Sequence, residues 1–274
     1  MATATSLVLF LLACQVSEVG KVASVSDSAE ERLAYMQKTG SSYQVTVGEK
    51  SSGQPVTFRS KPVLRFTNPV SGVVDGGLFV WEDNEKRPVA AAQIFIIPQT
   101  DDVWLHEFQS LSTRPLRFEY NGRAAWAPAE AGVSFKPIPD AARPAATEPA
   151  RLRQMRQLVR RFSASDDFEG GDEDRLRMMT TPIARYRDQT TIDGAVFVFA
   201  HGTDPELFVI IEARPPQGDQ AATSDAQWHV ALAPMTSYAL QAQLDGKPYW
   251  SVHRRQEPIP VTATFKNFVF PPTH

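Results

Sequence analysis

Cysteine is nearly absent from this 274-residue sequence, in which Cys14 is the only one. A single cysteine excludes an intramolecular disulfide and any metal centre built from several cysteines. An excess of one charge is missing too, because 28 Lys and Arg residues face 31 Asp and Glu residues and leave a net charge of −3. A nucleic-acid-binding domain is expected to carry a basic face, so we expect no nucleic acid as a partner; the sequence identifies no other partner.

Long hydrophobic runs are also missing, since no stretch approaches the roughly 20 apolar residues that a membrane-spanning helix needs. The short run Leu7–Ala13, "LVLFLLA", has the length of the hydrophobic core of a secretory signal. We therefore predict that residues 1–28 are an export segment with a short linker. The protein is then located outside the cytoplasm, in the periplasm or cell envelope or secreted.

Two kinds of export signal fit this N-terminus. In the first, signal peptidase cuts near Ala13 or near Ala23-Ser24 and releases a soluble protein. In the second, "LLAC" resembles the bacterial lipoprotein signal, so Cys14 would receive the lipid and tether the protein to a membrane through its N-terminus only. No Lys or Arg precedes the run, unlike the basic start expected of either signal. The alternative is a cytoplasmic protein in which this run is a buried strand or helix turn.

The chain contains an internal similarity. Trp104–Trp126 aligns without a gap with Trp228–Trp250, at an offset of 124 residues. The blocks "RLAYM", "PVLRF" and "VVDGGLFVW" recur in the same order as "RLRQM", "PIARY" and "TIDGAVFVF". We interpret this as a tandem duplication. Its units are residues 29–140 and 148–265, with an Ala/Pro-rich linker at 141–147 and a C-terminal tail at 266–274. The alternative is coincidental recurrence of β-meander composition.

Each unit is predicted to be one helix followed by an antiparallel β-meander, an α+β fold dominated by β-structure. In "EPARLRQMRQLVRRF" the apolar side chains are three or four positions apart, which is typical of a helix face. Runs such as "AVFVFA", "ELFVIIEA" and "YALQAQL" are rich in strand-forming residues. Asn121-Gly122 and Asp245-Gly246 suit type I′ hairpin turns, whose central residues need positive φ.

Motifs of catalysis and cofactor binding are lacking as well. No serine lies in G-x-S-x-G, and no glycine-rich phosphate loop occurs. The segment His106–Phe108 lacks the second histidine of a zinc-protease helix, since Ser110 stands at that position. The acidic run Asp166–Asp174 lacks the spacing of an EF-hand loop, and we interpret it as a solvated loop. We expect no metal and no cofactor, and these absences weigh against an enzyme.

Two arginines stand at equivalent positions of the two units, Arg65 in the first and Arg185 in the second. An arginine repeated on equivalent strands indicates either a paired interior charge or a ligand anchor. His106 and His229 lie in corresponding strands, one position out of register. We take these four residues as candidate ligand-binding residues and name no catalytic residue.

The blocks "HEFQSLSTRPL", "RLRQMRQLVRRFSA", "GTDPELFVIIEAR" and "WHVALAPMTSYAL" resemble those of a family of functionally uncharacterised, apparently exported bacterial proteins. The resemblance covers roughly residues 60–255. It implies an exported location, and it brings no activity, cofactor or site residue.

The predicted function is a non-enzymatic binding or structural module of the cell envelope, which acts through the groove that two curved sheets make between them. The alternative is a hydrolase-like enzyme with its site on the strands of one unit. Asymmetry bears on this choice. A pocket of polar groups in one unit, with its counterpart filled in the other, would add weight to catalysis.

Overall fold

The structure is a computed structural model that describes residues 22–48, 53–98, 102–168, 174–216 and 226–270. The predicted export run and Cys14 lie outside these residues. The described chain is attached to the body from its start, because Ala23 is buried and its carbonyl accepts a hydrogen bond of 2.7 Å from Trp104 Nε1.

The first half begins with a helix whose start is fixed by its sequence. Ser28 caps α1 (Ala29–Ser41): its hydroxyl accepts from the Glu31 N–H, and the Glu31 carboxylate accepts from the Ser28 N–H, which satisfies two N–H groups at the helix start. The strands that follow are β1 (Tyr43–Val47), β2 (Gln54–Pro55), β3 (Thr57–Phe58), β4 (Leu64–Asn68), β5 (Val73–Glu82), β6 (Pro88–Ile97), β7 (Val103–Ser110), β8 (Leu116–Tyr120), β9 (Arg123–Trp126) and β10 (Lys136–Pro137).

The second half repeats this order of elements. It begins with α2 (Glu148–Val159), which has a proline in its first turn, where the missing N–H costs nothing. The strands that follow are β11 (Phe162–Asp166), β12 (Asp174–Arg175), β13 (Arg177–Met178), β14 (Ala184–Asp188), β15 (Thr191–His201), β16 (Asp204–Arg214), β17 (Gln227–Pro234), β18 (Leu240–Leu244), β19 (Lys247–Val252) and β20 (Phe265–Phe270).

The described strands form four antiparallel sheets, two small and two large. The small sheets have the orders β2-β1-β8-β9 and β12-β11-β18-β19. The large sheets have the orders β20-β7-β6-β5-β3, with β4 also on β5, and β10-β17-β16-β15-β13, with β14 also on β15. The predicted antiparallel, β-dominated α+β class is confirmed, and both halves use the same strand order.

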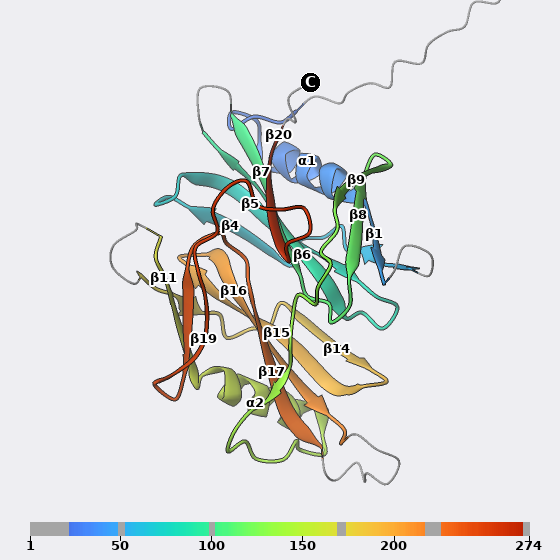
Figure 1. Cartoon of the computed structure of the whole chain (residues 1–274). Helices are drawn as coiled ribbons and strands as arrows, with labels where there is room; N and C mark the ends of the chain where they lie inside the picture. Colours follow the sequence, from blue (N-terminus) through green and yellow to red (C-terminus); the bar gives the residue numbers. More distant parts are fainter. Residues whose placement is uncertain (1–21, 49–52, 99–101, 169–173, 217–225, 271–274) are drawn as a thin grey trace, which may run out of the picture.

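The halves exchange their last strands. β10, at the end of the first half, pairs with β17 of the second, and β20 pairs with β7 of the first. Figure 1 shows this exchange as the dark-red β20 lying beside β7 in the upper half. The segment predicted as a C-terminal tail, residues 266–274, therefore carries a strand of the first large sheet. Strand exchange ties each half to the other by backbone hydrogen bonds.

Alternating side chains of the large sheets contribute to different cores. On β5, Leu78 and Val80 join a core shared with Val196 and Val198 of β15, so the two large sheets pack against each other. The intervening residues of each large sheet, such as Phe79, face a separate outer core that the helix and small sheet of the same half cover. The helices accordingly lie at opposite ends of the molecule (Figure 1).

Two hairpins have the geometry that the sequence predicts. Asn121 and Gly122 have φ of 49° and 74°, and Asp245 and Gly246 have φ of 51° and 75°. Positive φ at both central residues is what a type I′ turn requires. Neither α1 nor α2 combines the length and the apolar composition of a bilayer-crossing helix, within the part of the chain described.

Candidate functional site

Arg65 and Arg185 lie in equivalent ion-pair triads. Arg65 Nη2 contacts both oxygens of Asp75, at 2.5 and 2.6 Å, and Arg32 of α1 donates to the same carboxylate at 2.9 Å. The second half repeats this arrangement with Arg185, Asp193 and Arg151 of α2 in the corresponding roles. In each triad, an ion pair connects the helix to the large sheet of the same half. The geometry is that of a paired interior charge, and a ligand role for the two arginines stays a prediction.

His106 lies in the outer core of the first half. Its ring is fully buried, and its Nδ1 lies 2.9 Å from the Tyr43 hydroxyl. Burial lowers the pKa of His106 to about 3 and raises that of Tyr43, so neither group changes its charge near neutral pH. The surrounding rings of Tyr43 and Phe108 give this histidine a packing role in the structure.

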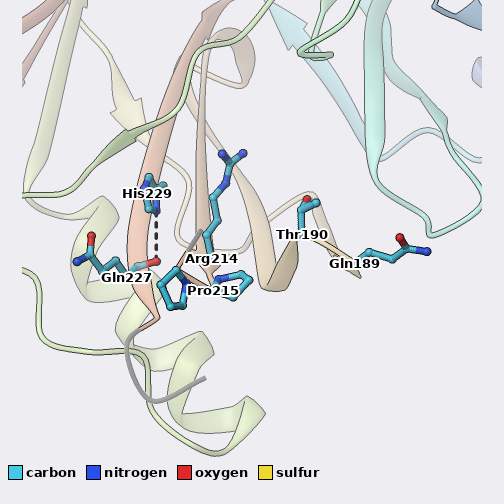
Figure 2. Close-up of a pocket in the computed structure, with 7 residues that line it drawn as sticks. Gln189, Thr190, Arg214, Pro215, Gln227 and His229 are labelled. Carbon is cyan, nitrogen blue, oxygen red and sulfur yellow. Dashed lines mark hydrogen bonds between the residues drawn. The ribbon is translucent and has the colours of Figure 1, made fainter. Parts of the chain in front are cut away.

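His229, in contrast, lines a pocket of about 420 Å³ in the second half. Figure 2 shows the pocket between the ends of β16 and β17 and the β14–β15 turn. The residues that line it are Gln189, Thr190, Arg214, Pro215, Pro216, Gln227 and His229. This volume lies in the range of small-molecule sites. The four candidate ligand residues are therefore not brought together, and His229 is the one that faces a pocket.

A buried carboxylate contacts the pocket-lining residue Arg214. Glu212 of β16 is completely inaccessible and accepts hydrogen bonds from the Tyr186 hydroxyl at 2.5 Å and from Arg214 Nε at 2.6 Å. Thr191 Oγ1 lies 3.4 Å from the same carboxylate. Desolvation and the negative charge of Glu212 raise the pKa of Tyr186 well above its usual value, so the phenol stays a donor. This carboxylate fixes the position of Arg214.

The first half supplies another arginine to this network. Arg87, from the β5–β6 hairpin, lies 2.6 Å from Glu212 through Nη2 and 2.8 Å from Asp188 through Nη1. Both cations lie against the Phe135 ring, whose centroid is 3.8 Å from the Arg214 guanidinium carbon and 5.6 Å from that of Arg87. Two arginines and two carboxylates balance, so the network as a whole is neutral.

The equivalent place in the first half is apolar. Phe66 and Phe95 flank Gly76 in the strand register, as Tyr186 and Glu212 flank Gly194. Five positions differ in this way. The apolar cluster consists of Phe66, Val73, Phe95, Ile97 and Leu105, and the polar cluster at the matching positions consists of Tyr186, Thr191, Glu212, Arg214 and His229.

The pocket offers both donors and acceptors. The contact of 3.4 Å between His229 Nδ1 and the Gln227 carbonyl places the ring proton on Nδ1, because a carbonyl can only accept. Desolvation lowers the pKa of His229, so the ring is neutral near pH 7 and its Nε2 accepts. Of the Arg214 nitrogens, Nε carries the described hydrogen bond, which leaves its terminal N–H groups as donors. The lining also has side chains that can both donate and accept hydrogen bonds, namely Gln189, Thr190 and Gln227.

Four residues of this network were not predicted from the sequence: Glu212, Arg214, Arg87 and Tyr186. A signal for two of them was present, because Glu212 and Arg214 end the otherwise apolar run "LFVIIEAR". By the strand registers, these two charged residues occupy the positions that Phe95 and Ile97 hold in the first half. The difference between the halves is therefore charged against apolar at both positions. Arg87 gave no signal, since its role depends on how the two large sheets pack.

Comparison with known proteins gives no match of any kind. No family model, no curated protein and no solved structure is significantly similar to this chain.

Proposed function

We propose that the protein is a non-enzymatic binding module that holds a small, uncharged, hydroxyl-rich ligand of the carbohydrate class in the second-half pocket. The observation that carries the proposal is the polar cluster, which replaces five apolar residues on an otherwise equivalent scaffold. The fold does not require these polar groups, because the first half folds the same strands around Phe66 and Phe95. Buried polar networks are costly, so their presence beside a pocket points to a ligand.

The chemistry of the lining favours hydroxyl groups. A hydroxyl both donates and accepts, and the lining pairs donors on Arg214 with an acceptor on His229. The ion pairs behind the pocket are already balanced, so there is no uncompensated charge to recruit an ion. Pro215 and Pro216 add apolar surface against which the carbon face of a sugar can pack.

A hydrolase-like enzyme is the alternative, and the asymmetry between the halves adds weight to it. A general acid or base must reach the reacting atoms with a free proton or lone pair. Glu212, the buried carboxylate nearest the pocket, is instead held by Arg87, Arg214 and Tyr186. This occupation favours binding over catalysis.

We also propose that the two halves arose by tandem duplication. The repeated order of elements, the two matching Arg–Asp–Arg triads and the reciprocal exchange of β10 and β20 support it. Overlay of Leu33–Trp126 on Leu152–Trp250 tests this proposal, and strands that fail to coincide would contradict it. The exported, cell-envelope location remains a proposal that rests on residues 1–28 of the sequence.

Isothermal titration calorimetry of the full chain against glucose, maltose and N-acetylglucosamine tests the binding function, with glucuronate as the charged comparison. We expect saturable binding of at least one neutral sugar. Arg214→Met should weaken it by at least about tenfold, because a hydrogen bond from a charged group is worth about 1.5–3 kcal/mol. The exposed Arg153→Met is the matched control and should bind normally. No heat with any of the three neutral sugars, or a preference for glucuronate, would contradict the proposal. Turnover of a bound sugar would establish the enzyme instead.

A further inference from the structure

A second group of polar side chains lies in the second half, on different elements from the pocket. Asp166 ends β11, Asp174 begins β12, and His201 ends β15. Each offers one ligand-type atom, and these atoms all lie within 4.8 Å of one another. The group is therefore assembled from three segments of the chain.

Asp166 is buried, and one of its carboxylate oxygens has no hydrogen-bond partner. It lies on the inward face of β11, 2% exposed, in line with the core residues Phe162 and Ala164. One oxygen, Oδ1, accepts the Phe168 N–H at 3.3 Å, whereas Oδ2 has no hydrogen-bond partner. His201 Nδ1 is also buried without a hydrogen-bond partner. Buried polar atoms are nearly always paired, so two unpaired atoms in one group suit a ligand that contacts both of them.

The charges in the group are unbalanced. Asp166 and Asp174 are directly opposite each other in the β11–β12 register, and like charges in that position repel. Nearby arginines are engaged elsewhere, since Arg254 pairs with Asp167 at 2.8 Å and Arg177 donates to the Gly202 carbonyl. Among the described residues, no Lys or Arg forms an ion pair with either carboxylate.

The scaffold itself does not need these side chains. The strand registers match Asp166 with Val47 and Asp174 with Gln54, and the hairpin positions match His201 with Asp83. The first half folds the same β1–β2 pair with an apolar and an amide side chain there. The ligand-type group is thus a property of the second half.

We propose that Asp166, Asp174 and His201 bind a divalent transition-metal ion of the zinc class. Two carboxylates balance a divalent charge, and the two unpaired atoms gain a partner. An imidazole ligand selects zinc and its transition-metal neighbours over calcium and magnesium, which take oxygen ligands. Three protein ligands leave a coordination position open for water or for a group outside the chain. The Phe168 ring packs edge-on against that of His201, with centroids 5.3 Å apart.

Zinc titration of the full-length chain, without a tag and after dialysis against a chelator, tests the proposal. Calorimetry gives the stoichiometry, and the unfolding midpoint gives an independent reading. We expect about one zinc ion per chain and a midpoint that rises with zinc concentration, since a ligand bound only by the folded state stabilises it. Asp166→Asn and His201→Gln should each weaken binding by at least about tenfold, since even indirect partners of a metal site contribute 10- to 100-fold.

Two controls keep the test decisive. The exposed residue Glu130 lies in the first half of the chain, away from the site in sequence, and Glu130→Gln should bind zinc as the wild type does. Without metal, Asp166→Asn should unfold no earlier than the wild type, because it removes an uncompensated buried charge. Absence of zinc binding, zinc binding that survives both site variants, or stabilisation by calcium that does not depend on His201 would each overturn the proposal.

Discussion

The apolar and polar clusters occupy matching places in two halves that share one order of strands. In the apolar cluster Phe66 and Phe95 pack with ring centroids 6.1 Å apart, and no ionic group is needed. In the polar cluster Tyr186 and Glu212 meet in a hydrogen bond of 2.5 Å within a network of ion pairs. The same order of strands therefore accommodates either set of side chains, an apolar cluster in one half and a polar cluster in the other.

The apolar and the polar cluster contribute differently to the stability of the fold. Burial of an apolar side chain contributes about 1.5–3 kcal/mol wherever it fits. A buried ion pair gains little over an apolar replacement of the same volume, yet the removal of one partner is strongly destabilising. A single substitution in the polar cluster should therefore lower the free energy of unfolding strongly, whereas replacement of the whole cluster by apolar residues should not. The apolar cluster contains no ion pair, so this difference does not arise there.

The largest expected effect follows from this fragility. Glu212→Ala leaves Arg87, Arg214 and the Tyr186 hydroxyl around an empty acceptor position. We expect a loss of about 3–5 kcal/mol in the free energy of unfolding, measured by chemical denaturation. Glu212→Gln, which keeps an acceptor for Tyr186 and loses the charge, should cost less.

The decisive comparison for this prediction is the exchange of the whole polar cluster. The five substitutions are Tyr186→Phe, Thr191→Val, Glu212→Phe, Arg214→Ile and His229→Leu, which install the residues of the apolar cluster. Arg87 keeps its ion pair with Asp188. Stability should return to within about 2 kcal/mol of the wild type. A fivefold variant no more stable than Glu212→Ala would show that the two places are not equivalent.

The helix triads should behave alike in the two halves. Asp75 and Asp193 are both nearly buried, and each holds an arginine of its helix and one of its sheet. Asp75→Asn and Asp193→Asn should each cost about 2–3 kcal/mol, below the full value for a buried pair because Arg65 and Arg185 are partly exposed. Chemical denaturation measures both, with the exposed Glu130→Gln as the control. Markedly unequal losses would break the correspondence of the halves.

The sequence predicted the parts of this comparison that depend on local chemistry. Each half has one helix, beginning at Ala29, which Ser28 caps, and at Glu148, with a proline in its first turn. The Asn-Gly and Asp-Gly turns follow from the conformations that glycine and short polar residues tolerate. The strand exchange escaped prediction, since pairing between β10 and β17 or between β20 and β7 depends on distant contacts.

The site was predicted less well for the same reason. His229 lines a pocket and its ligand-binding role stays a prediction, but its sequence pattern is no different from that of His106, which the fold buries. What distinguishes the two is the face of the sheet that each ring occupies and the neighbour opposite. His106 lies opposite Ile94, and His229 lies opposite Glu212. Neither neighbour can be known without the strand register.

The two ends of the interface between the halves should respond oppositely to pH. At one end Arg87 holds the pKa of Asp188 below its usual value. At the other end Asp204, which occupies the position of Arg87 in the matching hairpin, accepts a hydrogen bond from Asn68, and desolvation raises its pKa to about 7. The first pair gives stability that is present above the unfolded-state pKa of Asp188 and lost in acid. The second gives stability that is full below about pH 4, the usual pKa of an aspartate, and is lost as the pH rises through 7.

Asp204→Asn tests this opposition with the smallest expected effect. The variant should match the wild type near pH 4.5 and exceed it near pH 8, by on the order of 2 kcal/mol, because the amide never acquires the buried charge. Asp188→Asn should show the reverse pattern, with its deficit greatest near neutral pH and smaller in acid. Chemical denaturation at half-unit steps between pH 2.5 and 8 measures both slopes, because the change for Asp188 falls below about pH 4 and that for Asp204 above it. If the difference in unfolding free energy from the wild type changed with pH in the same direction for both variants, the proposed opposition between Asp188 and Asp204 would be wrong.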